Sequence, residues 1–151
     1  MSTLMMPVHP PDWPRPSGYS TVMIGEGKLV AIAGQIGCDP ITDDVVSDDF
    51  AQQSRQALAN VLTALEAAGG KAEHLIRLTW YITDRDAFLK NSEKIERAYR
   101  EELGDHYPAM SVIVVSGLLE PRAKVQIEAT ALLQPRTNTK GTKAKAKVAK
   151  K

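Results

Sequence analysis

The chain has 151 residues, 43% of them hydrophobic and 25% charged, and its 19 basic and 18 acidic residues give a net charge of +1. These values are ordinary for one globular domain, and the absence of any apolar run of roughly 18–20 residues excludes an integral membrane protein. The single cysteine excludes an internal disulfide, the N-terminus lacks a signal-peptide pattern, and the three histidines lack zinc-ligand spacing, so we expect a cytoplasmic protein without a metal site.

Residues 1–16 are predicted to form an extended, proline-rich arm. They contain five of the nine prolines, and proline lacks the backbone N–H that a helix interior needs. Two apolar-rich segments follow at 19–25 and 29–34, with the sequence Gly-Glu-Gly-Lys between them. Because Gly25 and Gly27 can adopt the positive φ of a tight turn, we expect these segments to pair as a β-hairpin.

A long helix is predicted from Asp48 or Asp49 to the Gly69-Gly70 pair. Asp49 and Gln52 have the spacing of a capping box, in which each side chain bonds a free backbone N–H. The two glycines suit the left-handed position that ends a helix. The apolar stripe has helical spacing, and it consists of Ala51, Ser54, Leu58, Val61, Leu62 and Leu65.

The second half of the chain is predicted as strand, helix, strand and strand. Residues 75–83 alternate apolar and polar side chains, as a half-buried strand does. Residues 86–103 carry an apolar stripe at helical spacing and end at a glycine. Residues 109–115 and 124–133 are predicted to be two further strands.

The predicted order β-β-α-β-α-β-β describes an α+β domain with two helices packed on one face of a sheet. Residues 29–33 and 112–115 are nevertheless apolar at consecutive positions, so both faces of these strands require burial. We therefore expect a homo-oligomer that buries the open sheet face between copies of the chain.

Residues 134–151 are predicted to form a disordered, lysine-rich tail. They hold seven basic residues and no acid, for +7, which leaves 12 basic and 18 acidic residues, or −6, in the rest of the chain. The tail has too few apolar residues to offset its ordering entropy. Such a tail can neutralise nucleic-acid phosphates, but a solubilising extension of an acidic domain is the favoured interpretation.

Three polar residues are candidates for chemistry from their positions. Asn91 lies on the apolar stripe of the second helix, where a buried amide with a structural role is the favoured interpretation. Glu128 is either a solvated surface acid or, if its face lines a cleft between copies, a general base. Tyr19 either presents its hydroxyl to such a cleft or packs at a strand start. Cys38 and His106 lie in predicted loops, and we expect no catalytic role for them.

Four stretches of the chain form a recognisable set. They read Leu-Val-Ala-Ile-Ala-Gly-Gln-Ile at 29–36, Leu-Glu-Ala-Ala-Gly-Gly at 65–70, Tyr-Pro-Ala-Met-Ser at 107–111 and Val-Gln-Ile-Glu-Ala at 125–129. Together they resemble the RidA (YjgF) family of reactive-intermediate deaminases, over a domain at 17–133. The resemblance implies a chorismate-mutase-like fold and a homotrimer with a central barrel and clefts between subunits. Family members that are deaminases hydrolyse small imines or enamines to ketoacids and ammonia, without a metal or bound cofactor.

The resemblance also assigns roles to single residues. It places Tyr19, Asn91 and Glu128 in the cleft, and Glu128 positions the hydrolytic water. Gly34 matches the glycine of the family's Ser-Gly-Gln motif, whereas Ala33 replaces the serine. We expect all five residues to lie at the ligand site.

One position departs from the family pattern in a way that bears on the substrate. Met110 stands where the family has an arginine that clamps the substrate carboxylate with charge-assisted hydrogen bonds. Arg122, Lys124 and Arg77 are the candidate replacement cations, and Arg122 is counted among the predicted ligand-binding residues. Otherwise the ligand is not a simple 2-imino acid, or the deaminase activity has been lost.

Three functions follow in order of preference. The first is a hydrolase that deaminates a small imine or enamine in a cleft between subunits. The second is a non-catalytic trimer that binds a small metabolite in the same cleft. The third is RNA binding or cleavage, which the lysine-rich tail and the description of some family members as translation inhibitors suggest.

Overall fold

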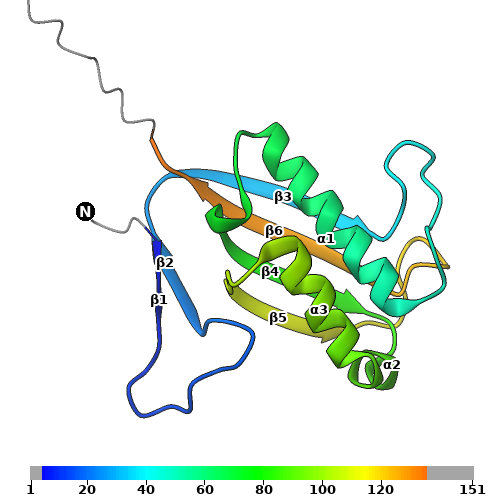
Figure 1. The fold of residues 1–151 in the computed structure, drawn as a ribbon, viewed down its shortest axis with the longest axis horizontal. Helices are drawn as coiled ribbons and strands as arrows, with labels where there is room; N and C mark the ends of the chain where they lie inside the picture. Colours follow the sequence, from blue (N-terminus) through cyan, green and yellow to red (C-terminus); the bar gives the residue numbers. More distant parts are fainter. Residues whose placement is uncertain (1–4, 136–151) are drawn as a thin grey trace, which may run out of the picture.

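The computed structural model describes residues 5–135, and its main feature is a four-stranded sheet with helices on one face (Figure 1). The strand order is β3-β6-β4-β5. Helices α1 and α3 lie side by side on the sheet, which confirms the predicted α+β class with helices on one face. The strands of this sheet are β3 (Lys28–Ile36), β4 (Leu75–Ile82), β5 (Ala109–Val114) and β6 (Val125–Leu133). The helices are α1 (Phe50–Ala67), α2 (Arg85–Lys90) and α3 (Ser92–Leu103), with a 3-10 turn η1 at Ala72–His74.

The core lies between α1, α3 and the sheet, and it is built from the periodic apolar positions of the sequence. Leu58 and Leu65 of α1 are fully buried, as are Leu78 of β4 and Ile127 of β6. Burial of one such side chain stabilises the fold by about 1.5–3 kcal/mol relative to its exposure. The opposite face of the sheet carries no helix of the described part of the chain, and Leu29 of β3 is 66% exposed.

Helix α1 begins as predicted. Asp49 is the N-cap, and its Oδ1 accepts a hydrogen bond from the Gln52 backbone N–H at 2.9 Å. The backbone N–H of Asp49 donates to Ser47 Oγ at 3.0 Å, so a serine hydroxyl takes the place of the reciprocal half of the capping box. After the helix, Gly69 has a φ of 88°, as the predicted left-handed stop requires.

The predicted hairpin of residues 19–25 with 29–34 is wrong. Strand β2 (Val22–Gly25) pairs antiparallel with β1 (Met5–Val8) to form a separate ribbon beside the sheet (Figure 1). Strand β3 pairs instead with β6. At Gly27 (φ 149°) a Cβ would lie 2.5 Å from the Leu133 carbonyl oxygen, so the glycine serves a close approach to β6 rather than a two-residue turn.

The single helix predicted at 86–103 is in fact two helices. Helix α2 begins after its N-cap Asp84, whose side chain accepts from the Ala87 backbone N–H at 2.9 Å. Asn91, with φ −99° and ψ 10°, interrupts the helical path before α3 begins at Ser92. The apolar stripe alone does not reveal this interruption, because Phe88 and Ile95 face the core on either side of it.

A buried glutamine connects α1 to the segments that flank the sheet. Gln53 has no exposed surface, and its Nε2 donates to the carbonyl oxygens of Ser47 (2.8 Å) and Arg122 (3.0 Å). Its Oε1 accepts from the backbone N–H of Lys124 at 2.8 Å. The loop before α1 and the segment before β6 are therefore fixed to the same side chain.

Two sequence predictions concern the ends of the chain. Within the arm predicted at 1–16, residues 5–8 form β1. The tail predicted at 134–151 lies outside the described residues except for its first two positions.

In the described part, every helix is too short or too polar to cross a membrane.

Candidate functional site

Glu128 lies near the middle of β6 on the face of the sheet that the helices leave open. Its strand neighbours Ile127 and Ala129 are buried on the helix side, as the alternation of the sequence predicts. Thr79 of β4 is its register partner, and the Tyr81 hydroxyl donates to Glu128 Oε1 at 2.7 Å. One carboxylate oxygen is thus held by tyrosine, which leaves Oε2 to accept a proton or a hydrogen bond from a ligand.

The bond between these two side chains affects the tyrosine. It raises the pKa of Tyr81 above its ordinary value, because ionised tyrosine loses the proton it donates; desolvation and the negative charge of Glu128 act in the same direction. The positive charge of Arg77 opposes this effect. Tyr81 is therefore a hydrogen-bond donor at neutral pH, and it fixes the orientation of the carboxylate.

A cavity of about 450 Å³ surrounds this pair on the open face. Strands β3, β4, β5 and β6 all contribute to its lining. Besides Glu128 and Tyr81, its polar side chains are Arg77, Thr79, Ser111 and Thr130. One base, several hydroxyls and one cation therefore converge on a shallow site that a small anionic molecule fits chemically.

Ala33 and Gly34 lie across from Glu128. The register of β3 with β6 shifts between Ile32 and Gln35, which pair with Ala129 and Ile127 respectively. Ala33 and Gly34 therefore face the single residue Glu128, as in a β-bulge. The structure brings these two predicted site residues to the candidate base.

Met110 lies on the other face of the sheet. Its register partner is the buried Leu78, whereas the next residue, Ser111, pairs with Thr79 and lines the open-face cavity. The Met110 side chain packs against the core under α3. A single chain therefore does not bring Met110 and Glu128 into one cleft.

The remaining predicted site residues are also separate from Glu128. The amide of Asn91 donates to the Ala87 carbonyl at 2.8 Å within its own helical segment. Tyr19 precedes β2 and is 44% exposed. Arg122 pairs with Asp48 at 3.2 Å, at the start of α1.

Of the three candidate replacement cations, only Arg77 lines the cavity around Glu128. The ammonium of Lys124 donates to the Asp48 carbonyl, beside Arg122. Tyr81 was not among the predicted site residues, although the alternation of its strand indicates its position. Arg77 and Tyr81 alternate along a strand whose apolar positions face the core, so they share the open face.

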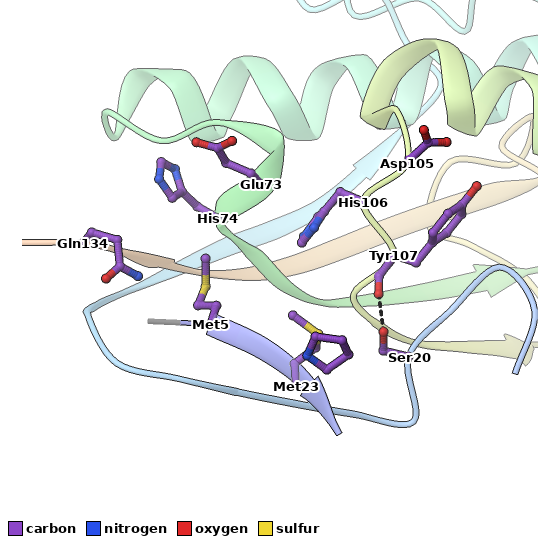
Figure 2. A pocket seen from close by; sticks show the side chains of 10 residues that line it. Met5, Ser20, Met23, Glu73, His74, Asp105, His106, Tyr107 and Gln134 are labelled. Carbon is purple, nitrogen blue, oxygen red and sulfur yellow. Dashed lines mark hydrogen bonds between the residues drawn. The ribbon is translucent and has the colours of Figure 1, made fainter. Parts of the chain in front are cut away.

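A second cavity of about 540 Å³ lies at the end of the sheet between the β1–β2 ribbon, η1 and the loop after α3 (Figure 2). Its two imidazoles are engaged by backbone groups. His106 Nε2 lies 2.7 Å from the Leu75 carbonyl, and His74 Nδ1 accepts from the Lys71 N–H at 2.8 Å. In the same cavity the Ser20 hydroxyl donates to the Tyr107 carbonyl, as Figure 2 shows. The His106 and Ser20 bonds fix the loop and the ribbon to each other and to β4, so the two imidazoles and the Ser20 hydroxyl have structural roles.

Comparison with known proteins gives one family. The family model described as "Endoribonuclease L-PSP" matches residues 14–133. A RutC family protein of Pyrococcus horikoshii is 37% identical over 118 residues, which cover 78% of this chain and 90% of the relative. A 2-iminobutanoate/2-iminopropanoate deaminase of Salmonella typhimurium is 35% identical over 106 residues, which cover 70% of this chain and 80% of the enzyme.

Solved structures agree with the sequence relatives. A Rid family protein of unknown function from Yersinia pestis, YyfB, superposes with a TM-score of 0.77 at 28% identity, covering 87% of this chain and all of its own. RidA from an Antarctic Psychrobacter gives a TM-score of 0.62 at 27% identity, covering 78% of this chain and 89% of its own. The similarity thus extends over nearly all of the described residues.

Proposed function

Because the chain belongs to the RidA (YjgF) family, whose model carries the description endoribonuclease L-PSP, we propose that it hydrolyses small imines or enamines at the open-face site around Glu128. The family includes 2-iminobutanoate/2-iminopropanoate deaminases. The observation that carries the proposal is the Glu128 carboxylate, held by Tyr81 on one oxygen and open to the cavity on the other.

The proposed reaction needs a base that can return the proton it takes. Glu128 accepts a proton from a water molecule as that water attacks the carbon of the protonated imine, which forms a neutral carbinolamine. It then returns this proton to the nitrogen, the C–N bond breaks and ammonia leaves, and the carbinolamine hydroxyl gives its proton to the Glu128 carboxylate as the carbonyl forms. Glu128 loses that last proton to the ammonia or to solvent. The Tyr81 bond keeps the carboxylate in the orientation that these transfers require.

Arg77 is the proposed partner of the substrate carboxylate. Met110 cannot supply a charge, and Arg122 and Lys124 are engaged near Asp48. Arg77 shares the open-face cavity with Glu128, and a guanidinium binds a carboxylate through two parallel hydrogen bonds. The cation in this chain is then supplied by β4 instead of β5.

We further propose that other copies of the chain cover the open face, as in a homotrimer. Leu29 and Ile113 are exposed apolar residues on this face, and their burial between copies removes them from water. Met110 and Glu128 lie on opposite faces, so a cleft that contains both needs two chains. Tyr19 and Asn91 would then join Glu128 from a neighbouring copy.

The direct test is hydrolysis of 2-iminopropanoate formed in situ from alanine by an amino-acid oxidase. The loss of imine is followed by trapping the remainder with semicarbazide. We expect Glu128→Gln to lower the catalysed rate by about 10²–10⁴-fold, the range for loss of a general base. Glu66→Gln, on an exposed acid of α1, serves as the matched control. A wild-type rate equal to the background, or full activity of Glu128→Gln, would contradict the proposal.

A further inference from the structure

The cavity between the β1–β2 ribbon, η1 and the loop after α3 lies apart from the site around Glu128 (Figure 2). The ligand-site residues that the sequence predicts all lie in the described part of the chain, and they are absent from its lining. The cavity has a volume of about 540 Å³. Its structural hydrogen bonds leave two kinds of group unused, which are the methionine sulfur atoms of the ribbon and one imidazole nitrogen.

One face of the ribbon turns two thioethers to the cavity. Pro7 lies opposite Met23 in the register of β1 with β2. Met5 precedes Pro7 by two residues and therefore shares this face, and all three residues line the cavity. Met6 lies on the other face and is 49% exposed. Figure 2 shows the Met5 and Met23 side chains extending from the ribbon toward the imidazoles.

His106 presents a ring nitrogen with a free lone pair. Its Nε2 lies 2.7 Å from the Leu75 carbonyl oxygen, which can only accept, so Nε2 carries a proton. In the neutral ring the lone pair is then on Nδ1. Imidazoles that bind metals have this arrangement, in which a carbonyl or carboxylate oxygen holds the second ring N–H. The Nδ1 atom is therefore oriented as a ligand.

His74 has the opposite arrangement. Its Nδ1 accepts from the Lys71 backbone N–H at 2.8 Å, so the lone pair of the neutral ring is already used and Nε2 carries the proton. Metal binding at His74 would break the bond that closes η1. The donor set of the cavity is therefore two thioethers and one imidazole.

The charges of the lining favour a cation, and the donor set selects a soft one. In the described part of the chain, the acids of the lining are Glu73 and Asp105, and it contains no lysine or arginine. Both carboxylates are exposed, so they attract a cation without forming the all-oxygen shell that Ca²⁺ and Mg²⁺ require. Zinc sites are built from thiolate, imidazole and carboxylate ligands. Thioethers instead select soft ions such as Cu⁺.

We infer that this cavity binds a soft monovalent cation, Cu⁺ or its analogue Ag⁺, through the sulfur atoms of Met5 and Met23 and Nδ1 of His106. The inference does not rest on imine hydrolysis, because these three residues lie outside the cavity around Glu128. The ligands come from β1, β2 and the loop after α3, so no local spacing in the sequence indicates them.

The test is a titration with Ag⁺ that is followed through ¹³C-labelled methionine methyl groups. The full chain carries Cys38→Ser, because the thiol of its single cysteine is itself a soft ligand. We expect Ag⁺ to move the methyl signals of Met5 and Met23 to saturation and to leave those of Met6 and Met110 in place. The same concentration of Zn²⁺ should move none of these signals.

Two pairs of variants locate the site. Met23→Leu removes a thioether at nearly constant volume and should weaken Ag⁺ binding at least about tenfold, whereas Met6→Leu makes the same change on the exposed face and should leave it unchanged. His106→Gln keeps an N–H donor for the Leu75 carbonyl but removes the ring lone pair, so it should also weaken binding at least about tenfold. His74→Gln should leave the affinity unchanged.

The outcomes are separable. Unmoved Met5 and Met23 signals, equal losses in Met23→Leu and Met6→Leu, or full affinity in His106→Gln would each overturn the inference. Cu⁺, added without oxygen in competition with a chromophoric chelator, should rank the variants in the same order, and another order would refute a Cu⁺ site. Imine hydrolysis by the same preparation is measured separately, so the two proposals fail independently.

Discussion

Arg77→Gln tests how this chain recognises a carboxylate without the arginine that Met110 replaces. Arg77 pairs in register with Thr130, two residues from Glu128 along β6, and lines the same cavity. In the proposed function, Arg77 holds the substrate carboxylate while the imine carbon lies near the Glu128 carboxylate. The glutamine retains polar atoms and much of the length of the side chain but removes the charge.

The expected magnitude follows from the exposure of the site. A hydrogen bond to a charged group contributes about 1.5–3 kcal/mol, and a bidentate pair in a dry site contributes more. Because Arg77 is exposed, we expect only one such contribution, which corresponds to a loss of about 10- to 150-fold in kcat/KM. The loss should appear mainly in KM, since the carboxylate is charged in both the ground state and the transition state.

The assay compares two substrates and three variants. The substrates are 2-iminopropanoate and a neutral imine of similar size, both formed in situ by an oxidase. Arg77→Lys should retain part of the activity, because lysine keeps the charge but not the planar pair of donors. Arg100→Gln, on the exposed face of α3, is the control for loss of a cation elsewhere.

The discrimination between substrates is the decisive result. We expect Arg77→Gln to lower kcat/KM for 2-iminopropanoate and to leave the neutral imine nearly unaffected. Equal losses for both substrates would show that Arg77 acts through the fold, and no loss for either would show that the carboxylate is bound elsewhere. Either outcome refutes the assignment of Arg77.

Three further predictions concern the structure. Gly37→Ala should lower the free energy of unfolding by about 1–3 kcal/mol in urea titrations, because a Cβ there would lie 2.5 Å from the backbone Cα of Gln53 in α1. Gly34→Ala should lower it less, because the atoms nearest to its Cβ belong to the flexible side chain of Gln126. Asp49→Ala should cost about 1 kcal/mol in the same titration, and Asp49→Ser should recover most of it. In an absorbance titration at 295 nm, Tyr81 should ionise above its ordinary pKa of 10.0, and Glu128→Gln should lower that pKa. Because the pKa is raised in the folded state, the Tyr81–Glu128 bond stabilises the fold at neutral pH, and this stabilisation is lost as the pH rises past 10. An unchanged Tyr81 titration in Glu128→Gln would contradict the last prediction. Equal losses of unfolding free energy in Gly37→Ala and Gly34→Ala would contradict the first.

Helix α1 and the four strands of the sheet were predictable because their signals are local. The alternation of β4 and β6 and the apolar stripe of α1 identify both the elements and their buried sides. The partner of β2 was not predictable in this way. A glycine-rich connection is typical of a hairpin, but β2 pairs with the earlier strand β1, in which Pro7 lies opposite Met23. Only long-range packing selects that partner.

The candidate site was predictable in part. The face that Glu128 occupies follows from the period of its strand, whereas the position of Ala33 and Gly34 opposite it follows from the register of β3 with β6. The separation of Met110 from Glu128 depends on the register between β4 and β5. No spacing within one segment encodes the register of a parallel pair, so the position of Met110 on the opposite face from Glu128 became apparent only from the structure.

The buried glutamine of α1 has a consequence for the order of folding. The hydrogen bonds of Gln53 to the segment before β6 join residues 69 and 71 positions apart, so they form only after the two halves of the chain have met. Contacts of such high sequence separation are entropically costly to close early. Loss of the Gln53 side chain should therefore speed unfolding far more than it slows folding, as for a contact that is completed after the transition state.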